Sequence, residues 1–491
     1  MNEKEKRLFM SNYDDPKWDR VFDVNHILEE ELGETHLENG IVLPLQLRTD
    51  IKTEDEIYKG GVVASDFSFV AGLKRHYEKE DANISVCRGY EVPQEELVYR
   101  DETVVFGGIL YSHFGDTLLM TSNRLWWFTE HPDTPYKFVF LNKPGEDAYP
   151  DFFFDVLGLA RERVEVIDRP TSFKEIIIPD ESCYILTHAS RKWLETFEYM
   201  KENVRRQLPA SPYEKIYLSR TKFQKFGTGD GLNEAYYENF FAERGFHVVY
   251  PEMLPFAEQI NVIMNAKEIA CVFGTLSHMA LFAQNGIRQI NIMRTTELWI
   301  HQAVINQVKE LDFYWIEGTI NPLATPHNYG YFLYYPTKYF KAFLDSQGMV
   351  YPEEEFQSPV PPREMVLEYI MHWTEHFSDP EYNWRVKDKT TFEHLHALSL
   401  ALFGKELSKE DYQPTKLSQE LNKQKLRTEQ EQKKRREQEK INEQLRKFNR
   451  QLLEERDSYK ERLEKTQSSA SWKITKPMRD VHKVLKKVVK S

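Results

Sequence analysis

Polar side chains that can bind an anion follow two apolar runs of this sequence. Arg220 comes directly after the first run, and Thr275, Ser277 and His278 follow the second. A guanidinium forms charge-assisted hydrogen bonds with phosphate oxygens, and the unpaired N–H groups at the start of a helix attract the same oxygens. If both runs are strands of one parallel sheet, these groups meet at its carboxyl edge, where such sheets bind ligands.

The elements that would position these residues alternate between strand and helix. Gly245 ends one amphipathic segment as a C-cap glycine does, and Pro251 ends the strand that follows. Strands that alternate with helices of about ten residues predict a parallel sheet covered on both faces. The predicted strands are 216–218, 246–250, 268–273, 287–293 and 313–316, and the predicted helices are 233–244, 258–266, 277–284 and 298–311.

A second, independent alternation precedes the first, and it also carries groups that can move a proton. His113 and Asp116 follow a Gly-Gly bend, and either side chain can accept a proton there. The structural alternative is a packed histidine and an N-capping aspartate. Here the predicted hairpin is 60–75, the strands are 104–111, 136–141, 164–167 and 175–178, and the helices are 151–159 and 193–208.

The order of short motifs resembles the glycosyltransferase 61 family, in its bacterial polysaccharide-synthesis branch, over about residues 60–345. Two positions depart from the family pattern. Asp116 stands where relatives commonly have a second histidine, and Gly231-Leu232 stand where they often have a second arginine, for which Lys222 or Lys225 would substitute. The matching motifs are Gly107-Gly108, His113-Phe114-Gly115, Arg124-Leu125-Trp126, Ser219-Arg220, Asn233-Glu234, Gly245-Phe246, Pro251-Glu252, Gln259 and Gly274-Thr275 with His278.

The resemblance implies an α/β fold with two Rossmann-like domains and a cleft between them, the GT-B architecture. It also implies an inverting glycosyltransferase that uses a nucleotide-sugar donor. No Asp-x-Asp motif follows a predicted strand, so we expect a site without metal or other cofactor, in which cations neutralise the diphosphate. The base would be His113 or Asp116, and Arg124 and Asp66 would face the acceptor. The expected donor-binding residues are Arg220, Lys225, Asn233, Glu234, Glu258, Gln259, Gly274, Thr275, Ser277 and His278.

Each of these residues has a plainer interpretation. Arg220 could form a surface salt bridge, and Arg124 could pair with a carboxylate of its own domain. Ser277 could be an N-cap. Asn233 and Glu234 could be a cap and a first-turn acid, and residues 258–259 could belong to a solvated helix face.

Composition and charge limit the classes of partner. The chain has 491 residues, 41% of them hydrophobic, which is enough for two or three packed domains. Its three cysteines show no metal or disulfide spacing, and the start lacks a signal peptide, so we expect a cytoplasmic protein. The net charge is −13, but residues 422–491 carry 22 basic and 11 acidic side chains, which leaves −24 on residues 1–421. Such an acidic body disfavours nucleic-acid binding.

The predicted organisation ends in a helix and a basic tail. Apolar residues at Ile441, Leu445, Phe448 and Leu452 keep heptad spacing, which predicts either a dimeric coiled coil or a single solvated helix. The tail places an apolar stripe among lysines, as interfacial helices do, so we expect peripheral contact with the inner face of the cell membrane. The expected segments are a mobile lead-in (1–58) with a helix near 21–32, an acceptor domain (59–208), a donor domain (213–345), a helical annex (346–412), a long charged helix or coiled coil (413–466) and a basic amphipathic tail (467–491).

The sequence therefore favours an enzyme that acts on a nucleotide sugar and on a glycan or lipid-linked acceptor, in the synthesis of surface polysaccharide such as capsule. A catalytically silent scaffold with the same body remains the alternative, because of the departures at Asp116 and before Asn233. Nucleic-acid binding by the tail is disfavoured, because the tail has one tryptophan rather than a series of aromatic platforms.

Overall fold

The computed structural model describes residues 3–48, 57–77, 85–223, 231–323 and 331–378. The predictions for Lys225, for the charged helix at 413–466 and for the tail at 467–491 lie outside these residues. Among the described helices, none is both long and apolar enough to cross a membrane.

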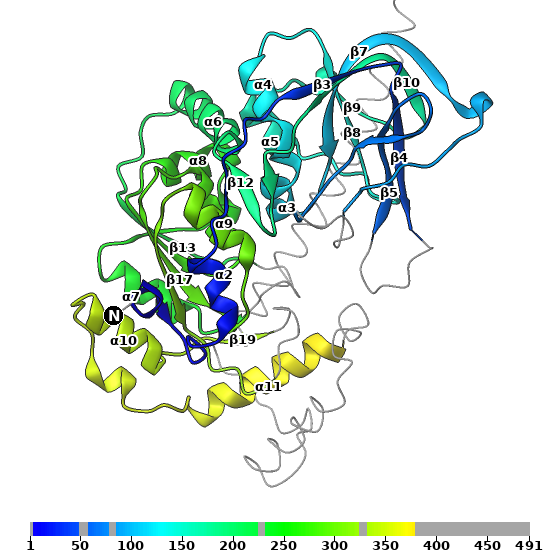
Figure 1. The fold of residues 1–491 in the computed structure, drawn as a ribbon. Helices are drawn as coiled ribbons and strands as arrows, with labels where there is room; N and C mark the ends of the chain where they lie inside the picture. The colour runs from blue at the N-terminus through cyan, green and yellow to red at the C-terminus, as the bar shows by residue number, and fades with distance from the viewer. Residues whose placement is uncertain (1–2, 49–56, 78–84, 224–230, 324–330, 379–491) are drawn as a thin grey trace, which may run out of the picture. The chain divides into compact units, whose positions relative to one another are not determined.

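In the described part of the chain, six parallel strands form the sheet of the second half (Figure 1). Their order is β1-β18-β17-β16-β13-β15. From β13 onward the chain follows the flavodoxin-like order, so the direction of winding reverses between β13 and β16. The strands are β1 (Leu8–Phe9), β13 (Lys215–Leu218), β15 (His247–Val249), β16 (Glu268–Val272), β17 (Arg288–Met293) and β18 (Asp312–Glu317).

The helices predicted between these strands are present, with one change of type. Residues Thr275–Phe282 form a 3-10 helix, η6, where the sequence predicted an ordinary helix at 277–284. Gly245 adopts a φ of +82°, as expected of a glycine that ends a helix. The other helices of this half are α7 (Ala235–Ala242), η5 (Pro251–Met253), α8 (Phe256–Met264), α9 (Ile300–Val308) and α10 (Lys338–Ser346).

The prediction of a mobile lead-in over 1–58 is wrong for the described residues. Strand β1 (Leu8–Phe9) extends the second sheet by pairing in parallel with β18. Arg7 forms an ion pair with Asp312 at 2.9 Å, and the buried ring of Trp18 lies 5.6 Å from that of Trp315. The sequence analysis missed β1 because a strand of two residues is too short to show the alternation of apolar and polar residues. The helical elements here are α1 (Glu3–Arg7), η1 (Pro16–Trp18) and α2 (Asp19–Phe22), and residues Ile27–Leu28 of the helix predicted at 21–32 form strand β2 instead.

The first half contains a mixed sheet rather than the parallel sheet of a Rossmann-like domain. Four strands, in the order β10-β7-β8-β9, are parallel, and β3, β4, β5 and β6 add antiparallel pairs. The hairpin predicted at 60–75 corresponds to β5 and β6. The sequence analysis missed β3 and β4, because they lie in the predicted lead-in. The strands are β3 (Glu34–Glu38), β4 (Ile41–Leu47), β5 (Tyr58–Val63), β6 (Phe69–Ala71), β7 (Val98–Ile109), β8 (Lys137–Leu141), β9 (Val164–Val166) and β10 (Thr171–Pro179).

The largest hydrophobic cluster of the described residues runs through both halves, and a separate cluster lies within the second half. Phe256 of α8 lies 5.7 Å from Phe114 and 5.0 Å from Phe152, measured between ring centroids, and Phe282 lies 5.2 Å from Phe197. The helices and 3-10 turns of the first half are η2 (Gln94–Glu96), α3 (Phe114–Leu119), η3 (Thr121–Arg124), α4 (Trp126–Glu130), α5 (Asp151–Leu157), η4 (Arg161–Arg163) and α6 (Trp193–Gln207).

Smaller elements complete the described chain. The helix expected from residue 363 is present as α11, and its buried Tyr369 and Trp373 pack in a cluster with Leu323 and Leu333. The remaining elements are β2 (Ile27–Leu28), β11 (Cys183–Tyr184), β12 (His188–Ser190), β14 (Gly231–Leu232), β19 (Phe332–Leu333), η8 (Glu353–Phe356) and α11 (Arg363–Ser378).

Candidate functional site

Two arginine side chains approach one point at the carboxyl edge of the second sheet. Arg220 follows β13 and Arg294 follows β17, on either side of Gly274, which follows β16. A Cβ atom placed on Gly274 would lie 3.0 Å from Nη2 of Arg294 and 3.6 Å from Nη1 of Arg220. Gly274 has a φ of +153° and a ψ of −153°, a conformation that essentially only glycine adopts. Glycine is therefore needed both for the turn and for the approach of the arginines.

A network of hydroxyl groups holds the loop that carries Arg220. The carboxylate of Glu238, on α7, accepts hydrogen bonds from Ser219 Oγ at 2.6 Å, Thr221 Oγ1 at 2.6 Å and Tyr250 Oη at 2.8 Å. Two of these three charge-assisted bonds, from Ser219 and Thr221, fix the loop on both sides of Arg220. The guanidinium is therefore supported by a rigid sheet and helix.

The buried side chain of Glu234 lies beside the arginine pair. It is 7% exposed, and its Oε1 accepts the backbone N–H of Arg220 at 2.8 Å. Burial raises the pKa of this carboxyl to about 7, although Arg220 and Arg294 favour its charged form. Its neighbour Asn233 adopts a φ of +71° and donates to the carbonyl of Tyr334 at 3.1 Å, so Asn233 shapes the turn into α7.

Of the three predicted site residues in η6, one is accessible and two are buried. Thr275 is partly exposed, whereas Ser277 is buried and its Oγ donates to the Gly274 carbonyl at 2.6 Å. The alternative prediction of Ser277 as an N-cap is wrong, because Gly274 precedes the first residue of η6 and Ser277 is its third residue. His278 Nδ1 lies 2.8 Å from Gln302 Oε1, and burial lowers the pKa of His278 to about 4. His278 is therefore neutral near pH 7, and the amide oxygen of Gln302 assigns the ring proton to Nδ1.

The start of α3 brings His113 and Asp116 to this edge of the second sheet. A Cβ on Gly115 would lie 3.1 Å from Thr275 Cγ2, so α3 packs directly on the start of η6. His113 Nδ1 is 3.5 Å from Asp116 Oδ2, and the His113 side chain is 61% exposed. The two candidate bases are therefore accessible and lie next to the residue that follows Gly274.

Three other predicted site residues have structural partners elsewhere. Arg124 is buried, donates to the carbonyls of Pro179 and Gly72, and lies 3.9 Å from the carboxylate of Glu181, which matches its plainer interpretation. Asp66 accepts the N–H and hydroxyl of Ser68 in the β5–β6 turn. Gln259 Nε2 donates to the Pro251 and Leu254 carbonyls and fixes the loop before α8.

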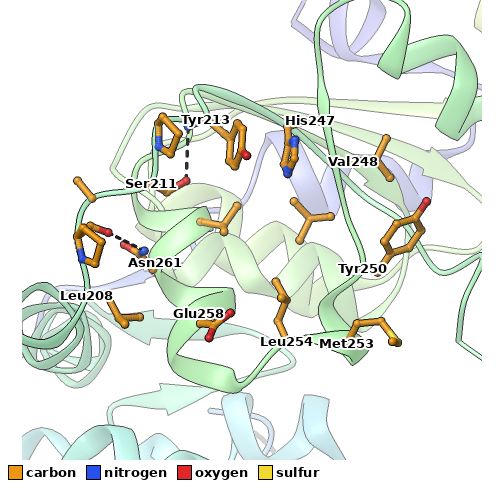
Figure 2. A pocket seen from close by; sticks show the side chains of 15 residues that line it. Leu208, Ser211, Tyr213, His247, Val248, Tyr250, Met253, Leu254, Glu258 and Asn261 are labelled. Atoms are coloured by element: carbon orange, nitrogen blue, oxygen red, sulfur yellow. Dashed lines mark hydrogen bonds between the residues drawn. The ribbon is translucent and has the colours of Figure 1, made fainter.

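Glu258 lines a cavity of about 480 Å³ along the outer strand β15, apart from the arginine pair (Figure 2). One end holds the stacked rings of Tyr213 and His247, whose centroids are 3.5 Å apart. Tyr250 and Met253 line the other end. The lining does not include Arg220 or any residue of η6, so Glu258 is separated from the arginine pair and from Thr275.

Sequence reasoning missed Arg294. The signal was present, because Arg294 follows a predicted strand of the same sheet, just as Arg220 does. The sequence-based prediction named only Lys222 and Lys225, close to Arg220 in the sequence, as the second cation. In the described residues, no group of three or more His, Cys, Asp or Glu side chains is arranged to hold a metal ion.

This geometry defines a class of protein: an α/β protein whose parallel sheet carries a cationic site at the point where the winding reverses. Residues 93–290 match the family described as Glycosyltransferase 61, a range that includes β13, β16, α3, α7 and the start of β17. This region belongs to the glycosyltransferase 61 family, so the chain carries a glycosyltransferase domain. No curated protein matches the chain.

Proposed function

We propose that this chain is an inverting glycosyltransferase that transfers a sugar from a nucleotide-sugar donor without requiring a metal ion. The observation that carries the proposal is the convergence of Arg220 and Arg294 at Gly274. Two guanidinium charges match the two negative charges of a nucleotide-sugar diphosphate, and both can form bidentate hydrogen bonds with its oxygens. The same cations would stabilise the additional charge that develops as the nucleoside diphosphate leaves.

The acceptor would be activated from the first half. His113 or Asp116 would take the proton from the attacking hydroxyl while that oxygen bonds to the anomeric carbon and the bond to the diphosphate breaks. The contact between α3 and Thr275 supports this role, because it holds the two side chains close to the arginine pair. A single displacement of this kind inverts the anomeric centre.

The direct test is release of nucleoside diphosphate from a panel of nucleotide sugars, with a bacterial glycan or lipid-linked acceptor fraction added. We expect release from at least one donor, retained in EDTA and lost in Arg220→Ala. Activity that disappears in EDTA and returns with Mg²⁺ would contradict metal independence. Nucleotide binding with no release from any donor would favour the alternative, a catalytically silent scaffold.

We further propose that the enzyme acts in surface polysaccharide synthesis, such as capsule, at the inner face of the cell membrane. The support is the sequence of residues 467–491, where lysines flank an apolar stripe, and the basic excess of residues 422–491 against an acidic body. Residues 413–466 would act as a spacer or as the seam of a homodimer. Neither role depends on a particular donor or acceptor.

A further inference from the structure

Glu234 is the acidic residue of this site whose negative charge a bound anion could replace beside the two arginines. It lies at the start of α7, 7% exposed, with Oε1 fixed by the backbone N–H of Arg220 at 2.8 Å. Both Arg220 and Arg294 act on its charge. Two cations that approach one point repel each other, and a carboxylate beside them offsets this repulsion when no anion is bound.

The other ionisable groups around Glu234 come from three elements. Glu238, one turn later on α7, opposes its ionisation, and its carboxylate already accepts three hydroxyl hydrogen bonds. Tyr217 of β13 and Cys271 of β16 are buried, and burial holds the pKa of each well above its usual range, so both are neutral near pH 7. Among these groups, Glu234 is the one whose pKa burial raises to about 7, so its charge can change near neutral pH.

We propose that binding of the donor diphosphate is coupled to uptake of one proton by Glu234, which gives up its charge when the diphosphate takes its place as counter-ion to Arg220 and Arg294. The inference rests on the proposed function. The proton comes from solvent, adds to the Glu234 carboxylate and returns to solvent when the anion leaves, so no other reactant is needed. A buried carboxylate and a diphosphate cannot both remain charged beside two arginines without mutual repulsion.

The coupling gives the site a preference among its ligands. The more negative the anion, the more it favours protonated Glu234, so a nucleoside diphosphate product would hold the proton more strongly than a nucleotide sugar. Rising pH would therefore weaken product binding more than donor binding. Release of the product would become easier above neutral pH.

The test uses inorganic pyrophosphate and the full chain, with the Glu234→Gln variant as comparison. Glutamine keeps an oxygen for the Arg220 N–H but cannot titrate. At pH 6 both proteins should bind pyrophosphate alike, and at pH 8 the variant should bind about 10-fold tighter, since each pH unit above the free pKa costs wild type up to ~10-fold. The protonation of pyrophosphate itself is the same for both proteins at a given pH, so it cancels in the ratio of their affinities. An affinity ratio that is equal at the two pH values would overturn the proposal.

Calorimetry in two buffers of different ionisation enthalpy counts the protons directly. Wild type should take up more protons at pH 8 than Glu234→Gln. Glu252→Gln is the matched control, because the Glu252 carboxyl also interacts with Arg220 and has a raised pKa through burial; this variant should keep the wild-type uptake. If Glu234→Gln does not fold, titration of wild type with sulfate, which does not change protonation in this range, should still show uptake, and none would overturn the proposal.

Arg220→Ala separates this proposal from the proposed function. If pyrophosphate binds wild type and Arg220→Ala equally, the diphosphate site itself is misplaced. If Arg220→Ala loses binding but wild type and Glu234→Gln take up the same number of protons, the donor site stands and the coupling is wrong.

Discussion

Removal of Arg294 is the sharpest test of the site, because this residue was found only from the structure. A hydrogen bond between a guanidinium and a charged oxygen contributes about 1.5–3 kcal/mol, which corresponds to about a 10- to 150-fold loss of affinity. Arg294→Ala should therefore raise the dissociation constant for the bound nucleoside diphosphate by that factor. The loss should appear in binding as well as in turnover, since the cation contacts the donor before and during transfer.

The matched control is Arg288→Ala, which changes the first residue of β17, whereas Arg294 follows the last. Arg288 pairs with Asp312 at 3.1 Å at the opposite end of the strand. Titration calorimetry with nucleoside diphosphates would compare the three proteins, and thermal unfolding without ligand would show whether loss of the Arg294 contact with the Phe332 ring, at 5.0 Å, costs stability. Wild-type affinity in Arg294→Ala, or an equal loss in Arg288→Ala, would refute the reasoning.

Three further outcomes are expected. His113→Ala and Asp116→Asn should lower turnover while nucleotide affinity stays near wild type, and wild-type turnover in both would place the base elsewhere. Burial lowers the pKa of Lys309 in the folded protein to about 8. Between pH 8 and ~10.5 the unfolded chain therefore binds one more proton at Lys309 than the folded protein does, so stability rises with pH in this range. The free energy of unfolding of wild type relative to Lys309→Met should therefore rise by about 1–3 kcal/mol between pH 7.5 and 10, and a pH-independent difference would contradict this. A chain ending at residue 466 should pellet less than the full chain with anionic liposomes, and equal pelleting would exclude the tail as the anchor.

The second half of the fold was predictable because its strands and helices each have a clear period and a clear stop. The predicted strand at 268–273 is β16, and the helix expected to end at Gly245 is α7. Elements held by long-range pairing were not predictable. Strand β3 pairs with β10, more than 120 residues away, and nothing in its own sequence indicates that partner.

The candidate site was predicted in part, for the same physical reason. Arg220 and Thr275 each follow a predicted parallel strand, which predicted that they meet at the carboxyl edge of the sheet. The structure places both at Gly274. Whether a polar side chain faces the site or serves the backbone depends on its rotamer and its neighbours. The side chains of Ser277 and Gln259 are engaged by carbonyls, which a motif cannot show.

The position of β1 has a consequence for how the protein is made. Its two residues are synthesised well before their partner β18, which follows about 300 residues later. Until then Leu8 and Phe9 have no sheet to join, while the edge of β18 is exposed once it forms. Deletion of β1 would therefore leave that edge open and favour aggregation, even though the deleted residues lie far in sequence from every residue of the candidate site.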